Sequence, residues 1–301
     1  MGSTQLSTAA FGQRRPQHEP GRRARLRRVL SGTRERLRGR DLALASAGAS
    51  LYGALAVVPS MLVAVSLAQV VLGRELVSGY GERLAEALPG AMGATQATDQ
   101  VFGAGLALSP LGILFAIGMG SAYGEGLSRA LLRFAPVPRD AKPPTLLLRA
   151  ATLPLLGLAP LLLSGLLVIS PWLAGLVARE GTPGVALASY VSLTLVWVLT
   201  WLPLTWTFRV VGPGHPSWRS AFLGAVVTGA FLSGFLQGFL VFLALPVDLG
   251  RPFGGLVAVG VASALLLWLW VLHAVLLVGY AFTWAVEGER DGLPPDAVPA
   301  P

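Results

Sequence analysis

Residues 254–282 read GGLVAVGVASALLLWLWVLHAVLLVGYAF and contain no Asp, Glu, Lys or Arg. A helix of about 20 predominantly apolar residues crosses the hydrocarbon core of a bilayer, so this stretch is long enough to span a membrane. Ser263 and His273 are polar, but they do not form the charged face that an amphipathic helix of a soluble domain presents to water. The stretch therefore predicts a transmembrane helix.

Five other apolar stretches precede this one, at residues 42–72, 101–121, 146–171, 185–208 and 221–246. The chain of 301 residues is 53% hydrophobic and 13% charged, whereas soluble domains carry about 25% charged residues. We therefore predict an all-α, polytopic membrane protein with a bundle of about six transmembrane helices. The first stretch is overlong and contains Pro59, so it is either one tilted span or a surface helix that leads into a kinked span.

The distribution of charge divides the chain into three regions. Residues 1–40 form a basic cytoplasmic tail, predicted to be partly disordered and to become a surface helix from about Arg22. Residues 41–286 form the transmembrane domain, and residues 287–301 form an acidic, proline-rich cytoplasmic tail. Between the first two apolar stretches, Leu76, Tyr80, Leu84 and Leu88 recur at a helical period, which predicts a short amphipathic helix on the outer face.

The basic residues predict how the chain is oriented in the membrane. If the N-terminus is cytoplasmic, 19 of the 23 Lys and Arg residues fall in cytoplasmic segments, as the positive-inside rule requires. An even number of spans then places both termini in the cytoplasm. The strongly basic net charge of +8 is on this interpretation a sign of topology, and we predict a multi-pass protein of a bacterial inner membrane.

The basic tail also predicts a partner. Anionic lipids of the cytoplasmic leaflet attract clustered arginines by about 1 kcal/mol per charge. Aromatic residues do not interleave these arginines, as they would in a surface that stacks nucleic-acid bases, so we predict membrane lipids and not nucleic acid as the partner. The candidate contacts for lipid headgroups are Arg22, Arg23, Arg25, Arg27 and Arg28.

Polar side chains inside lipid are costly, so those within the spans are candidates for function. Counting outwards from residue 250, between the fifth and sixth stretches, brings Gln237 level with Ser263 and Thr228 level with His273. We take these four residues as the candidate pathway for a substrate. The alternative is that they form hydrogen bonds that hold neighbouring helices together. The small-residue pairs Gly120–Gly124, Gly234–Gly238 and Ala49–Gly53 indicate close helix packing, within one chain or in a homo-oligomer.

Several kinds of chemistry lack their residues in this sequence. There is no cysteine, and the three histidines are far apart in sequence without HxxxH or HExxH spacing. GxSxG and P-loop motifs are also missing. We therefore predict no cofactor, no metal site and no enzymatic activity.

Four segments together resemble a known family. SLYGALAVVPSML (50–62), GMGSAYGEGLSRALLRF (118–134), PSWRSAFLGAVVTGAFLSGFLQGFL (216–240) and FGGLVAVGVASALLLWLWVLHAVLLVGYAFTWA (253–285) are similar, in this order, to the YihY/BrkB family of bacterial inner-membrane proteins, once mislabelled as ribonuclease BN. Tyr52 and Pro59 match the family pattern. The chain departs from it at Ala56 and Phe253, and Ala281 lies where the family has an acidic residue.

The resemblance implies a role in envelope integrity and in the movement of lipid or a lipid-like molecule between leaflets. Two alternatives stay open from the sequence. One is a scaffold or regulator that does not transport and anchors partners through its basic tail. The other is a channel formed by several copies of the chain.

Overall fold

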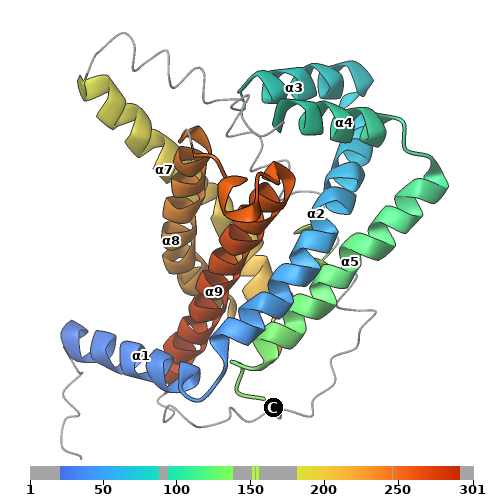
Figure 1. Ribbon diagram of the computed structural model, residues 1–301. Coiled ribbons are helices and arrows are strands. Elements are labelled where there is room, and N and C mark those ends of the chain that lie inside the picture. The colour runs from blue at the N-terminus through green and yellow to red at the C-terminus, as the bar shows by residue number, and fades with distance from the viewer. Residues whose placement is uncertain are drawn as a thin grey trace, which may run out of the picture.

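The computed structural model describes residues 21–87, 94–137, 151–152, 154–155, 182–245 and 247–291, and its regular elements in these ranges are all helical (Figure 1). In chain order they are α1 (Arg22–Leu37), α2 (Leu42–Leu72), α3 (Arg74–Ala87), α4 (Ala94–Leu106), α5 (Pro110–Leu132), α7 (Thr182–Trp206), the π-helical turn η2 (Thr207–Val211), α8 (Trp218–Ala244), the 3-10 turn η3 (Arg251–Phe253) and α9 (Val257–Asp291). The predicted all-α fold is confirmed.

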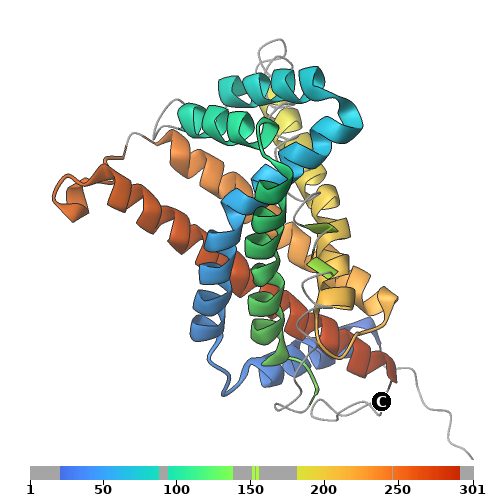
Figure 2. The ribbon, with the colours of Figure 1, turned by 90° about the vertical axis from the view of Figure 1, so that its right-hand side faces the viewer.

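The long helices α2, α5, α7, α8 and α9 form the bundle, with α1 at one end and α3 and α4 at the other (Figures 1 and 2). Four helical segments in the described part are long and apolar enough to cross a membrane: Leu42–Leu72, Ala186–Val211, Trp218–Phe239 and Val257–Arg290. They coincide with the first, fourth, fifth and sixth predicted spans. The first continues through Pro59 as a single helix.

The second predicted span, at residues 101–121, is wrong in its bounds. It joins the end of α4 to the beginning of α5, and the chain leaves the helical path between Leu106 and Pro110. Pro110 lacks an amide hydrogen and suits the first turn of a helix, while the Ser109 side chain accepts a hydrogen bond from the Gly112 amide at 3.1 Å. This cap begins α5 at Pro110, and α5 then continues eleven residues beyond Ser121.

The third predicted span, at residues 146–171, lies outside the described residues except at 151–152 and 154–155. The end of α5 and the beginning of α7, the described residues on either side of it, lie at opposite ends of the bundle. α5 ends close to α1, whereas α7 begins at the end where α3 and α4 lie (Figures 1 and 2).

α3 and α4 pack against each other, where the sequence predicted one amphipathic helix. Val77 and Leu84 of α3 pack with Phe102 of α4 and with Val65 of α2. Gly81 lets α4 approach, because a Cβ atom there would lie 2.6 Å from the Phe102 ring. Of the apolar residues of the predicted amphipathic helix, Leu84 is buried and Leu76 is 69% exposed, while Val77 packs inwards. Leu88 lies outside the described residues.

The main core lies towards the α1 end of the bundle. Leu127 and Phe134 from the α5 region, Phe208 from η2, and Leu277 and Tyr280 from α9 are fully buried together. The predicted helix that begins near Arg22 is confirmed as α1, which packs across the end of α9 with Gly32 against Ala285. α9 runs to Asp291, so the first residues of the predicted C-terminal tail are helical.

α8 and α9 pack through two reciprocal glycine–threonine contacts. Thr228 of α8 fills the space over Gly279 of α9, and Thr283 of α9 fills the space over Gly224 of α8. Each threonine hydroxyl donates a hydrogen bond to the carbonyl of the glycine on its own helix, Thr228 to Gly224 at 2.6 Å and Thr283 to Gly279 at 2.9 Å. Glycines here permit close approach of two helices in a membrane.

The predicted small-residue pair Gly234–Gly238 does not make such a contact. A Cβ atom added to Gly234 would meet no atom of the described residues within 4 Å, and one added to Gly238 would make an ordinary contact with Trp268 at 3.5 Å. Ala49 and Gly53, by contrast, are buried in the bundle as predicted.

Candidate functional site

His273 lies at a junction of three helices, 4% exposed, and meets polar side chains from two of them. Its Nε2 atom is 2.9 Å from the Tyr123 hydroxyl of α5, and its Nδ1 atom is 3.2 Å from the Ser50 hydroxyl of α2. Nδ1 is also 2.8 Å from the Leu269 carbonyl. We call Ser50, Tyr123 and His273 the polar cluster.

The hydrogen bonds fit a neutral ring with its hydrogen on Nδ1. The Leu269 carbonyl can only accept, so Nδ1 carries the hydrogen, and Nε2 accepts from the Tyr123 hydroxyl. Ser50 donates to the Ser46 carbonyl at 2.7 Å, which leaves its oxygen free to accept from Nδ1. A neutral imidazole satisfies every one of these contacts. Gly53 makes room for the ring, since a Cβ atom there would lie 3.1 Å from His273 Cε1.

The four candidate pathway residues are not brought together. Thr228, 2% exposed, lies against Gly279 and not against His273. Gln237 donates a hydrogen bond to Ser192 of α7 at 2.7 Å and not to Ser263. Ser263 is partly exposed on α9. The level pairing that we predicted is therefore wrong.

The cause of the wrong pairing is the relative height of the two helices. The connection from Ala244 to Val257 is centred close to residue 250, as the prediction assumed. Thr228 nevertheless lies against Gly279, a position six residues beyond His273, because the two helices pack where each threonine meets a glycine.

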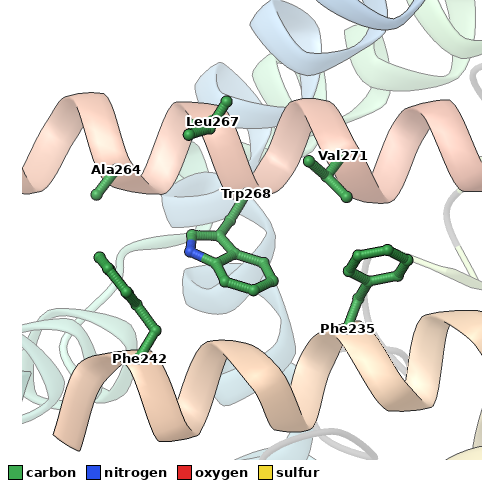
Figure 3. A pocket seen from close by; sticks show the side chains of 6 residues that line it. All are labelled: Phe235, Phe242, Ala264, Leu267, Trp268 and Val271. Carbon is green, nitrogen blue, oxygen red and sulfur yellow. The ribbon is translucent and has the colours of Figure 1, made fainter. Parts of the chain in front are cut away.

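A groove lies between α8 and α9, closer to the η3 turn than the glycine–threonine contacts are (Figure 3). Its volume is about 330 Å³, and its lining is apolar: Phe235, Phe242, Ala264, Leu267, Trp268 and Val271. We call it the aromatic groove. Its central residue is Trp268, whose ring lies 5.4 Å from that of Phe239 and 6.0 Å from that of Phe242. Leu267 is 61% exposed, so the groove opens to the side of the bundle.

Sequence reasoning missed the aromatic groove, although a signal for it exists. Phe235, Phe239 and Phe242 recur on α8 at spacings of four and three residues, which places their side chains on one face of the helix. From the sequence alone, such a face could equally be one that contacts lipid, and Trp268, which packs against it, comes from α9.

The five predicted headgroup arginines are all on α1 and exposed. Arg28 forms an ion pair of 2.8 Å with Glu289 of α9. A second polar contact closes the same end of the bundle: Ser217, which caps α8, donates to the Glu287 carboxylate at 2.7 Å and accepts from Arg290 at 2.7 Å. Glu287, Glu289 and Arg290 therefore hold neighbouring elements against the end of α9.

The polar cluster supplies hydrogen-bonding groups, and the aromatic groove supplies an apolar surface. Within the described ranges, no group of three or more His, Cys, Asp or Glu side chains is arranged to hold a metal ion. The polar cluster is buried, and the lining of the aromatic groove is apolar, so an occupant of the groove would make apolar contacts.

Comparison with known proteins gives one match. A family model described as virulence factor BrkB matches residues 33–300, which is nearly the whole chain and includes every described helix from α2 to α9. No curated protein and no solved structure matches the chain significantly. The match confirms the resemblance carried by the four sequence segments.

Proposed function

We propose, from the premise that this chain belongs to the virulence factor BrkB family of integral membrane proteins, that it helps lipid molecules move between the two leaflets of the membrane. The observation that supports this function best is the aromatic groove. The groove is apolar throughout and opens to the side of the bundle. It lies between α8 and α9, which are both apolar enough to be surrounded by lipid. The family is not a known enzyme family.

The groove suits the acyl part of a lipid. Apolar side chains in a membrane gain little from each other that lipid tails do not also provide, so a concave apolar surface there is readily filled by an acyl chain. Rigid aromatic rings keep its shape, because Trp268 is held between Phe239 and Phe242.

A lipid that crosses the membrane must also carry its polar headgroup past the hydrocarbon, which is costly without polar partners. Gln237 and Ser263 lie on the two helices that form the groove and are only partly buried, so we assign the headgroup path to them. Thr228 and His273 are enclosed between helices, and we assign them to holding those helices in place.

Translocation of headgroup-labelled phospholipid in proteoliposomes tests this function. We expect the protein to exchange label between leaflets well above empty vesicles, and Ala264→Phe, which fills the groove, to bring exchange close to that of empty vesicles. Gln237→Leu should also slow exchange. Ala262→Phe is the matched control, because Ala262 is exposed on the same helix and does not line the groove.

Exchange equal to that of empty vesicles, with zwitterionic and anionic lipids alike, would remove the proposal. The exposed basic face of α1 would then favour a scaffold, since Arg22 and Arg23 are exposed there and can meet a membrane surface or an acidic partner. Equal loss in Ala264→Phe and Ala262→Phe would show that bulk at this end of α9, and not the groove, matters.

We further propose that the chain lies in the inner membrane with both termini in the cytoplasm. The chain has no cysteine, so single cysteines can report sidedness without background. Gly21, at the beginning of α1, and Gly79, on α3, each have open space where a side chain would be added. In spheroplasts, an impermeant maleimide should label Gly79→Cys readily and Gly21→Cys only after lysis. The reverse pattern would overturn this orientation.

A further inference from the structure

A polar pocket of about 460 Å³ lies where the turn between α1 and α2 meets the end of α5. Its lining residues are Gly39, Arg40, Asp41, Arg129, Leu132 and Arg133, so half of them are arginines. We call it the arginine pocket. The beginning of α2 and the end of α5 lie side by side at the end of the bundle where α1 lies (Figure 1).

Local structure brings these arginines together. Gly39 has a positive φ of 65°, which allows the chain to turn sharply from α1 into α2. Arg40 then reaches across to α5 and donates a hydrogen bond to the Arg133 carbonyl. Arg129 lies one turn before Arg133 on the same helix and pairs with Glu125.

Among the described residues, the two acidic groups near the pocket, Asp41 and Glu125, have other partners. The Asp41 carboxylate accepts a hydrogen bond from the Leu44 amide at 2.9 Å and caps α2. Glu125 is engaged by Arg129. Arg40, Arg129 and Arg133 therefore supply more positive charge than these two carboxylates offset, and Arg133 has no ion pair within the described ranges.

Arg36, in the last turn of α1, adds a further positive charge four residues before Arg40. The Arg36 residue is 7% exposed, and its Nε atom has no hydrogen-bond partner in the described part of the chain. Burial lowers the pKa of the Arg36 guanidinium, and the like charge of Arg40 lowers it further. An anion at the pocket would offset this repulsion.

We propose that the arginine pocket binds a phosphate group, the chemistry shared by a phospholipid headgroup and by a free phosphate. Planar guanidinium groups match phosphate oxygens with paired hydrogen bonds, and three of them around one cavity provide several such donors. The pocket lies at one end of the bundle, next to the basic helix α1, where lipid headgroups are within reach. Binding here does not require a lipid to change leaflet, so it can hold or fail independently of translocation.

The test measures equilibrium binding to the purified full-length protein in a neutral detergent. The ligands are inorganic phosphate, short-chain phosphatidic acid and short-chain phosphatidylcholine. We expect Arg129→Gln/Arg133→Gln to bind at least about tenfold more weakly than the unmodified protein, because each arginine contributes charge-assisted hydrogen bonds. Arg34→Gln/Arg38→Gln is the control: it removes the same charge from exposed positions of α1 and its C-cap that do not line the pocket.

Unfolding temperatures without ligand show whether each variant is folded. If the double variant unfolds, Arg133→Lys serves instead, since it keeps the charge and loses the paired geometry, and it should weaken binding by severalfold. Loss of binding to inorganic phosphate and phosphatidic acid alike identifies a phosphate site open to soluble anions. Loss confined to the lipids identifies a headgroup site. Unchanged binding in the pocket variants, or equal loss in the control, would overturn the proposal.

Discussion

Replacing Gly279 by alanine should lower the free energy of unfolding by about 2 kcal/mol, the cost of overpacking a closely packed interface. The added Cβ atom would lie 2.6 Å from Thr228 Cγ2 and closer still to the threonine hydroxyl. Thr228 cannot move aside freely, because its hydroxyl is bonded to the Gly224 carbonyl and its side chain is buried. Unfolding by increasing amounts of SDS in mixed micelles measures the change.

Gly234→Ala is the matched control on α8, since its Cβ atom would meet open space. Alanine is the better helix former, so this variant should be as stable as the original or more stable, by up to about 1 kcal/mol. Thr228→Ala removes the two nearest atoms at the contact, so Gly279→Ala/Thr228→Ala should cost at least about 1 kcal/mol less than the sum of the single changes. Strict additivity would contradict the reciprocal glycine–threonine interface.

These contacts show what the sequence predicted and what it did not. Apolarity over more than 20 residues predicted α2, α7, α8 and α9, because lipid and helix length together leave few alternatives. It did not separate α4 from α5, since both sides of the break are apolar. Ser109 and Pro110, an N-cap residue and a proline in the first turn, mark the beginning of α5, and this signal could have been recognised in the sequence.

The register of α8 against α9 could not be obtained in the same way. Hydropathy predicts that α8 and α9 cross the membrane, but it does not predict their relative height. That height is set by the packing of Thr228 and Thr283 against glycines of the opposite helix. For the same reason the partners of His273 were missed. Ser50 and Tyr123 are 223 and 150 residues away, and no local pattern connects them.

The candidate sites also divide by how they are built. The arginines of α1 are visible in the sequence as a cluster. The arginine pocket, by contrast, combines Arg40 from the turn between α1 and α2 with Arg133 from the end of α5. The aromatic groove likewise needs Trp268 opposite Phe239. Sites assembled across helices depend on packing, so a single sequence shows their residue types and not their grouping.

His273→Leu should lower the free energy of unfolding by about 2 kcal/mol. The reason is that Tyr123 would lose the acceptor of its hydroxyl hydrogen, and a buried polar group without a partner costs about 1–3 kcal/mol. Tyr123→Phe leaves the buried Nε2 atom of His273 without its donor, so it should also lower the free energy of unfolding, by about 1 kcal/mol or more. The SDS titration described for Gly279 measures both variants.

The double variant separates a true contact from two independent losses. With both partners removed, no unsatisfied hydroxyl remains, so Tyr123→Phe/His273→Leu should be about 1 kcal/mol more stable than the sum of the single effects predicts. Ser263→Ala is the control on α9, because Ser263 is partly exposed, and it should stay within about 0.5 kcal/mol of the original protein. Additive losses at Tyr123 and His273 would mean that the polar cluster does not join α5 to α9. The result also decides how a loss of lipid translocation in His273→Leu is interpreted. If the translocation rate per folded molecule equals that of the original protein, His273 supports the bundle. If the variant is folded but does not translocate lipid, His273 belongs to the lipid path.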